Sequence, residues 1–367
     1  MKLLYLIPSV NNAGGVAKIL ALKTHYFIEK WGYEIHVVTQ NEGHKNPFFD
    51  FHPTIVWHDI ERKGQSLKAV FQYKKQLKEV ALSLQPDCIV VADNGLKAYL
   101  VPFLLNKKIP IVFECHGSKY QKEAPFSISF LNKMKYNCTL WFKEWAAKQF
   151  DAFVVLNAES AKEWPASNCT IITNPLVIRT AEKKQISSKR VVAIARNAYE
   201  KGLDRLLVIW QQVAKRQPEW ELCIYGVLNP ETQLLPLAQA LGVESSVTFY
   251  PPVVAVETVY LDSAVFVMTS RYEGLGLVLL EAMASGLPCV AYDCPVGPRS
   301  IITDGVNGFL VEDGNVEAFV ERLALLFQDE KLRETIGENA QKSIANYELN
   351  TIMNQWKALF DSLIIQR

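Results

Sequence analysis

Short apolar runs alternate with amphipathic stretches along the first half of the chain. The runs are 3–8, 34–39, 88–92, 109–113 and 152–156, and Val and Ile are frequent in them. Runs that are apolar on both faces predict parallel strands covered by helices on each side. We therefore expect an open parallel sheet in this half.

The same rhythm returns in the second half of the chain. Apolar runs at 191–195, 221–226, 246–250, 264–270 and 288–292 alternate with helical patterns such as 202–216 and 315–327. Two doubly wound α/β domains fit this repeat, and a cleft between two domains is the ordinary place for a ligand.

A polar stretch at 173–189 separates the two halves. It carries Asn174-Pro175 and has no hydrophobic period, which is typical of a linker. We assign 1–175 to an N-terminal domain, 176–188 to the linker and 189–348 to a C-terminal domain. The remaining 349–367 predicts a helix that packs back on the N-terminal domain.

Composition narrows the class of protein. The 367 residues include 39 Lys and Arg against 38 Asp and Glu, so a net charge of +1 disfavours nucleic acid as a partner. Seven scattered cysteines without a C-x-x-C pair predict reduced, buried thiols. The first apolar stretch is too short for a secretory signal and no run is long enough to span a membrane, so we expect a cytoplasmic location.

The segment 270–288 carries the most specific pattern. Glu273 lies in a Gly-rich turn after a strand, and a helix is predicted from about Gly276. Free N–H groups and the helix dipole at this N-terminus suit a phosphate. Glu273 and Glu281 could bracket an extended ligand with hydroxyls at both ends; alternatively, Glu273 caps the helix and Glu281 is a surface charge.

The order E-G-x-G-x-x-x-x-E in this segment resembles the E-x7-E signature of the retaining GT-B glycosyltransferases of family 4. The resemblance implies two Rossmann-like domains facing across a cleft. It implies that Glu273 contacts hydroxyls of the transferred sugar and that Glu281 holds the ribose diol. The donor-binding residues expected on this basis are Gly14, Gly15, Gly274, Leu275, Gly276, Leu277, Val278 and Glu281.

A second motif lies where the first strand of the second domain turns into a helix. Arg196, Lys201 and Gly202 match the family's Arg-x4-Lys-Gly pattern, although Ala195 stands where glycine is usual. A guanidinium fork and an ammonium can offset the charge that grows on a departing diphosphate. Two basic residues in a loop are also common as solvated charges.

The first domain supplies two candidate loops. Gly14 and Gly15 follow the first strand, where glycines permit unusual backbone conformations and close ligand approach. No G-x-G-x-x-G is present, which disfavours an ordinary dinucleotide site. His116 follows a buried strand; it is either structural or, as the resemblance implies, a catalytic-site residue that contacts the sugar of the donor.

The donor's base is not fixed by the sequence. The segment 293–310 is similar to hexosyltransferases of the family, but Ser300 replaces a usual glutamate. The loops at 226–230 and 250–252 also depart from the usual glycine patterns, and they would lie near the base. UDP is favoured among the nucleotides.

The resemblance implies transfer of a hexose or N-acetylhexosamine from a nucleotide-sugar, with retention, to a saccharide or lipid-linked saccharide. The candidate catalytic residues are His116, Arg196, Lys201 and Glu273. No Asp-x-Asp is present, so we expect no metal, and the nucleotide-sugar is a co-substrate with no further cofactor. An epimerase and a catalytically silent sugar-nucleotide binding protein remain as alternatives.

One stretch suggests a membrane partner. Residues 119–148 contain six lysines and two glutamates interleaved with aromatic residues. This composition suits peripheral contact with an anionic membrane, such as the inner face of the cytoplasmic membrane. It equally suits a helix that covers the first domain with its aromatic residues inward.

Overall fold

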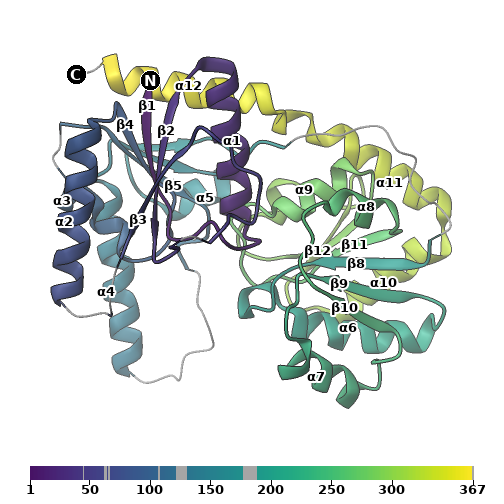
Figure 1. Cartoon of the computed structure of the whole chain (residues 1–367). Helices are drawn as coiled ribbons and strands as arrows, with labels where there is room; N and C mark the ends of the chain where they lie inside the picture. Colours follow the sequence, from purple (N-terminus) through teal and green to yellow (C-terminus); the bar gives the residue numbers. More distant parts are fainter. Residues whose placement is uncertain are drawn as a thin grey trace. The chain divides into compact units, whose positions relative to one another are not determined.

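A computed structural model describes residues 1–43, 45–61, 64, 67–105, 108–120, 130–176 and 188–365. These residues form two compact units (Figure 1). The first unit takes the described residues up to Pro175 and from Asn350 onward, and the second takes Leu176 to Leu349. Most of the predicted linker, 177–187, lies outside the described residues.

The first unit is built on a parallel sheet of seven strands in the order β3-β2-β1-β4-β5-β6-β7. All five apolar runs become interior strands of this sheet, β2, β1, β4, β5 and β6, which confirms the expected open sheet. The strands are β1 (Lys2–Leu6), β2 (Glu34–Gln40), β3 (Val56–Ile60), β4 (Cys88–Val91), β5 (Ile111–Cys115), β6 (Ala152–Val155) and β7 (Cys169–Ile171).

Helices of this unit connect and cover the strands. They are α1 (Gly15–Trp31), α2 (Leu67–Leu84), the short η1 (Ala98–Leu100) and α3 (Val101–Leu104), α4 (Phe130–Ala147), α5 (Ala158–Glu163) and α12 (Leu349–Ile365). The core joins inward side chains of β1, β4, β5 and β6 to residues of α2 and α4.

The C-terminal helix α12 packs on the first unit (Figure 1). The Tyr26 hydroxyl donates to Asn350 Oδ1 at 2.8 Å. The rings of Phe27 and Phe360 lie 5.8 Å apart, and Phe360 is fully buried. The last helix is therefore part of the core of the unit that the N-terminus begins.

The second unit repeats the plan with six parallel strands in the order β10-β9-β8-β11-β12-β13. The strands are β8 (Arg190–Ile194), β9 (Glu221–Tyr225), β10 (Val247–Tyr250), β11 (Val265–Met268), β12 (Cys289–Asp293) and β13 (Phe309–Glu312). Both units are thus Rossmann-like, as the alternating pattern predicts.

Helices of the second unit follow the predicted amphipathic stretches. They are α6 (Leu203–Arg216), α7 (Leu234–Leu241), α8 (Val256–Leu261), α9 (Leu277–Ala284), α10 (Val316–Gln328) and α11 (Glu330–Ser343), with short 3-10 turns η2 (Tyr199–Lys201), η3 (Pro230–Thr232), η4 (Pro298–Ser300) and η5 (Ile344–Tyr347). In α6 the residues Leu203, Leu206, Leu207, Trp210 and Val213 form one buried face.

Each sheet reverses its strand order at one place. The reversal lies between β1 and β4 in the first unit and between β8 and β11 in the second. Loops at the carboxyl ends of these strand pairs are the ordinary ligand site of such sheets. The Gly-Gly loop follows β1, the Arg196 loop follows β8 and the Glu273 loop follows β11, so all three motifs occupy such positions.

Two features differ from the sequence-based expectation. The sequences of the edge strands β3 and β7 are not apolar on both faces, so the pattern did not predict them. An edge strand leaves part of its surface to solvent, and in β3 Val56 and Trp57 are exposed. The expectation that the cysteines are buried is wrong for Cys138, which lies on the outward side of α4.

Candidate active site

The predicted basic loop after β8 is held against the end of β11. Gly202 closes the loop with a left-handed φ of 63°. A Cβ at this position would lie 2.2 Å from the Thr269 carbonyl oxygen, and the Thr269 hydroxyl donates to the Gly202 carbonyl at 2.9 Å. The two chain segments touch backbone to backbone, which glycine permits.

Lys201 and Glu273 meet at this junction. The Lys201 ammonium donates to both carboxylate oxygens of Glu273, at 2.8 and 3.0 Å, and the Ser270 hydroxyl donates to one of them at 2.6 Å. The lysine side chain is 22% exposed and the glutamate side chain 7% exposed. The residues lie in the loops that follow β8 and β11, the two strands that flank the reversal point, so the fold brings the two motifs together.

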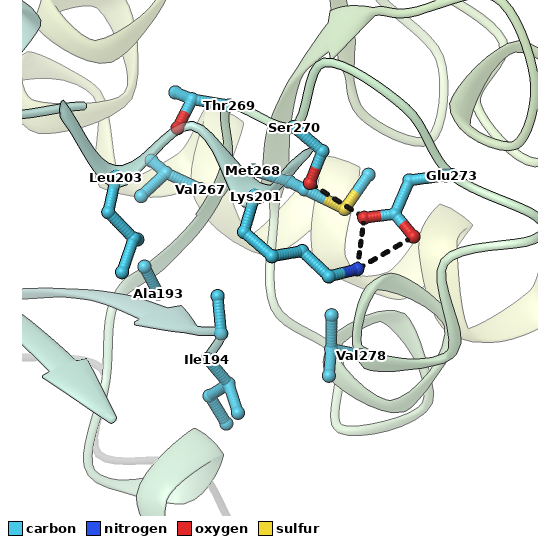
Figure 2. Close-up of a pocket in the computed structure, with 11 residues that line it drawn as sticks. Ala193, Ile194, Lys201, Leu203, Val267, Met268, Thr269, Ser270, Glu273 and Val278 are labelled. Atoms are coloured by element: carbon cyan, nitrogen blue, oxygen red, sulfur yellow. Dashed lines mark hydrogen bonds and ion pairs between the residues drawn. The ribbon is translucent and has the colours of Figure 1, made fainter. Parts of the chain in front are cut away.

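Figure 2 shows the pair at the wall of a small pocket, with the ammonium pointing at the carboxylate. The pocket combines one charged pair with apolar side chains. Its lining residues are Ala193, Ile194, Ala195, Lys201, Leu203, Val267, Met268, Thr269, Ser270, Glu273 and Val278. The sequence singled out Lys201, Glu273 and Val278 but not Ser270, whose hydroxyl orients the carboxylate.

Helix α9 begins beside Glu273 without a side-chain cap. Its N-cap is Gly276, in a left-handed conformation with φ 91°. The first N–H groups of a helix have no partner within the helix, and the dipole makes this end positive. The predicted start of the helix is confirmed, and Leu277 and Val278 are the residues whose N–H groups stand at that end.

Glu281 lies on α9, about one turn beyond its start. The buried Tyr260 hydroxyl donates to the Glu281 carboxylate at 3.3 Å and to the Val278 carbonyl at 3.1 Å. Burial, and secondly the Glu281 carboxylate, raise the pKa of Tyr260 well above its usual value. The phenol therefore stays a donor, and this contact, which the sequence did not indicate, fixes the Glu281 side chain.

Arg196 stands apart from the pocket. It does not line the pocket, its side chain is 60% exposed, and it contacts the Glu200 carboxylate at 3.2 Å. The structure thus brings Lys201 and Glu273 together but leaves Arg196 in a surface ion pair.

The Gly-Gly loop of the first unit differs from its predicted character. Gly14 is the N-cap of α1 with φ −79° and ψ 145°, a conformation open to any residue. A Cβ at Gly14 would lie 2.4 Å from Asn12 Oδ1, which accepts the Gly14 N–H at 2.9 Å, so another residue here would displace the Asn12 side chain. Gly15 is the first residue of α1.

His116 follows β5, as predicted, and its imidazole has a carboxylate partner. His116 Nε2 lies 3.0 Å from Glu114 Oε2, and its backbone N–H donates to Asn94 Oδ1 at 3.2 Å. Asn94 lies in the loop after β4, so His116 is anchored at the reversal point of the first sheet. Glu114 was not singled out from the sequence.

The ends of β9 and β10 carry a stacked pair of tyrosines. The rings of Tyr225 and Tyr250 lie 4.4 Å apart with an interplanar angle of 10°. Gly226 follows with φ 105°, and a Cβ there would lie 2.7 Å from the Ala195 carbonyl oxygen.

Ser300, which stands where the family usually has glutamate, donates its hydroxyl to the Gly297 carbonyl at 2.6 Å, within its own turn.

Among the described residues, one group has donor atoms close enough to hold a metal ion. It consists of His25, Glu29 and His52, whose atoms lie within 4.8 Å of one another. His52 Nε2 already lies 2.7 Å from Glu29 Oε1. The group contains no candidate catalytic residue.

Two family models match this chain. One, described as glycosyl transferases group 1, matches residues 177–343, and one described as glycosyltransferase family 4 matches residues 13–175. With both halves matched, the chain is a glycosyltransferase. The two matches cover both Rossmann-like units of this glycosyltransferase, and its fold is GT-B.

Relatives and a solved structure agree with the family. An uncharacterized glycosyltransferase of Haemophilus influenzae is 29% identical over 98% of this chain and 99% of the relative. The amylovoran biosynthesis glycosyltransferase AmsD of Erwinia amylovora is 27% identical with the same two coverages. The structure of Anabaena HepE in complex with UDP-glucose matches with a TM-score of 0.78 and 20% identity, over 99% of this chain and 100% of that one.

None of the described helices is both long enough and apolar enough to cross a bilayer.

Proposed function

We propose that this glycosyltransferase moves a hexose or N-acetylhexosamine, with retention of anomeric configuration, from a UDP-sugar to a saccharide or lipid-linked saccharide in surface polysaccharide or glycan assembly. The relative AmsD belongs to amylovoran biosynthesis, and HepE has the same fold and binds UDP-glucose. Neither relative nor the pocket favours an epimerase or a silent binding protein.

The observation that carries the proposal is the Lys201–Glu273 pair. An ionised carboxylate accepts hydrogen bonds only, so Glu273 suits the hydroxyls of a sugar, and Ser270 and Lys201 hold it in one orientation. The Lys201 ammonium has three donors and can contact a diphosphate oxygen while it keeps the carboxylate. One pocket thereby offers an anion for the sugar and a cation for the leaving group.

The rest of the donor is assigned to neighbouring groups. The uncapped start of α9, with Gly274, Leu275, Gly276, Leu277 and Val278, would bind the diphosphate through backbone N–H groups. Glu281, fixed by Tyr260, would accept the ribose hydroxyls. Arg196 would also turn to the diphosphate, since leaving its half-exposed ion pair with Glu200 costs only about 0–1 kcal/mol.

The first unit is assigned the acceptor and one edge of the donor. Gly14 and Gly15 at the start of α1, and His116 after β5, would approach the sugar and diphosphate. No step is assigned to a metal, because Lys201, Arg196 and the α9 N-terminus supply the positive groups. Retention predicts that the anomeric carbon has the same configuration in the product as in the donor sugar, which the anomeric proton signal in an NMR spectrum reports.

Donor binding is the first test. We expect UDP and a UDP-sugar to raise the melting temperature of the wild-type protein, in EDTA as in buffer, since a ligand that binds only the native state stabilises it by mass action. GDP and ADP should give smaller shifts. K201A should abolish the UDP shift, because the pocket then holds an unneutralised Glu273 carboxylate that repels the diphosphate.

An exposed lysine of the same unit provides the control. K215A removes one positive charge from the end of α6 and should keep the full UDP shift. A wild-type protein that gives no shift with any nucleotide would refute the donor site. A shift that survives in K201A would remove Lys201 from it.

Membrane contact is proposed for one face of α4. Phe130, Leu131, Met134, Trp141 and Trp145 are 80%, 67%, 51%, 67% and 43% exposed. This set, with the exposed Lys133, Lys135 and Lys148, is named the α4 surface. Large apolar side chains beside lysines suit the interface of an anionic bilayer. The aromatic residues are therefore not all inward, as a simple covering helix would have them.

The rest of the basic stretch behaves differently. Lys119 is 4% exposed and donates to Glu144 at 2.7 Å and to the Glu163 carbonyl at 2.6 Å, so it is a structural residue. Residues 121–129, which include Lys122 and Phe126, lie outside the described part of the chain.

Flotation on vesicles tests the α4 surface. We expect the wild-type protein to float with vesicles rich in phosphatidylglycerol and less with pure phosphatidylcholine. K133E/K135E should reduce the bound fraction at least about tenfold, since each lysine near an anionic surface contributes about 1 kcal/mol. K331E/K342E, the same charge change on α11, should float as wild type. Equal flotation of all three would contradict the proposal.

A further inference from the structure

Lys23 is a fully buried cation in the first unit. It lies on α1, its side chain is 1% exposed, and its ammonium donates to Glu114 Oε1 of β5. The ammonium also lies 3.6 Å from the centre of the Trp356 ring of α12. Burial of a charge is unfavourable without such partners. Apolar residues of similar volume often replace a buried ion pair without loss of stability, so we looked for a role of the Lys23 charge other than stability.

The carboxylate of Glu114 serves two partners at once. Its Oε1 accepts from Lys23 and its Oε2 lies 3.0 Å from His116 Nε2. Burial raises the pKa of Glu114, but the Lys23 charge and the His116 hydrogen bond outweigh it, and the pKa falls to about 2. Burial lowers the pKa of Lys23, against the influence of Glu114. The carboxylate is therefore ionised and can only accept.

The protonation of His116 follows from that carboxylate. Because Glu114 can only accept, the shared proton is on Nε2 of the imidazole. In the neutral ring Nδ1 then keeps a lone pair and is an acceptor. An unpaired buried carboxylate would favour the imidazolium, which has no acceptor; Lys23 neutralises Glu114 and limits this effect.

Two buried neighbours of this network, Tyr5 and Cys115, stay protonated. Burial, and secondly Glu114, raise the pKa of Tyr5 on β1 well above its usual value, so its phenol stays protonated. Burial raises the pKa of the Cys115 thiol to about 12, and the nearby Glu163 and Lys143 oppose each other there. Asn94 meets the His116 backbone without a charge. Lys23 and His116 are the partners that lower the pKa of Glu114 against its burial.

We propose that Lys23 and Glu114 are positioning residues for His116, which hold its proton on Nε2 and keep Nδ1 as an acceptor for a hydroxyl of the donor sugar. This inference rests on the proposed glycosyl transfer. It gives α12 a part in the site, because Trp356 covers the ammonium that balances Glu114.

The network predicts shifts of opposite sign in two variants of the full-length protein. K23M leaves the Glu114 carboxylate unbalanced, which favours the imidazolium, so His116 should take up its proton at a pH about one unit higher or more. K23M/E114Q removes both charges and the strong acceptor, so His116 should take up its proton at a lower pH than in wild type. A merely structural role gives no such reversal.

Two readouts follow the same titration. Protein labelled with 15N-histidine, with H116A to identify the signals, reports whether Nε2 carries the proton and at which pH the ring becomes charged. The pH profile of kcat/KM should lose activity on its acid side at a higher pH in K23M and at a lower pH in K23M/E114Q. K30M, an exposed lysine of the same helix, should match wild type in both.

The outcomes separate the inference from the function on which it rests. An unchanged His116 titration in the variants, or a proton on Nδ1 in wild type, overturns the inference even if transfer is observed. Shifts in NMR without any sugar transfer by the wild-type protein refute the proposed function and with it the positioning role. If K23M does not fold, K23M/E114Q carries the test, since it leaves no unpaired charge in the core.

Discussion

E273Q should lower turnover by roughly 10²–10³ while the protein remains folded, because it removes one preorganised charge from the pocket. The amide has the shape of the carboxylate and can still accept the Ser270 hydroxyl. The amide has no negative charge, however, and only one of its two polar atoms can accept from the Lys201 ammonium, which contacts both carboxylate oxygens of Glu273. It also offers a sugar hydroxyl a weaker acceptor. The measurement is kcat with a UDP-sugar and an active acceptor.

The same variant separates binding from chemistry. Lys201 remains in E273Q without its carboxylate, so UDP should bind as well as in wild type or more tightly in the melting assay. E231Q, an exposed glutamate of the same unit, should retain normal turnover. Turnover of E273Q close to that of wild type would exclude Glu273 from the reacting centre.

G202A should destabilise the second unit by about 2–5 kcal/mol in its free energy of unfolding and abolish transfer. An alanine with left-handed φ costs about 1–2 kcal/mol, and the added Cβ would lie 2.2 Å from the Thr269 carbonyl oxygen, so overpacking adds about 1–3 kcal/mol. The backbone must shift at the point where Lys201 is held toward Glu273. The melting temperature should fall by roughly 5–15 °C.

A second glycine isolates the contact from the backbone strain. Gly242 ends α7 with φ 69°, and nothing lies within 4 Å of a Cβ built there. G242A should therefore cost only about 1–2 kcal/mol and leave turnover unchanged. Equal effects of G202A and G242A on stability, or full activity of G202A, would show that the approach of Gly202 to Thr269 is unimportant.

The sequence predicted what local pattern controls. Val- and Ile-rich runs became the central strands of both sheets, and the start of α9 at Gly276 was found because a Gly-rich turn precedes an apolar helical pattern. Lys201 and Glu273 were named as candidate catalytic residues without a predicted contact; that contact needs β8 and β11 to be neighbours, which the reversal of strand order provides.

Local pattern failed where solvent or distant contacts decide. The edge strand β3 includes exposed Val56 and Trp57, so it lacks the double-sided apolar run of a central strand. Gly14 was expected to use an unusual backbone conformation, but its φ of −79° and ψ of 145° are open to any residue. The role of Arg196 toward the diphosphate stays a prediction, and its surface ion pair with Glu200, four residues on, was not indicated by the sequence.

The buried network had no local signal at all. Lys23 reads as one polar position on an amphipathic helix, and Glu114 as one polar residue in an apolar strand. The two positions are 91 residues apart, and only the packing of α1 on the first sheet joins them. The role proposed for them also depends on a third element, α12, whose Trp356 ring covers the Lys23 ammonium.

The discontinuous composition of the first unit also sets the order of its biogenesis. The second unit is a continuous segment and is complete when Leu349 has left the ribosome, whereas the first unit still lacks Trp356 and Phe360. Domains generally fold as units, N-terminal first, at about 5–20 residues synthesised per second. Here that order is reversed for the final step: the unit synthesised first closes last, and until then the Lys23 ammonium lacks the Trp356 ring, the nearer of its two aromatic neighbours.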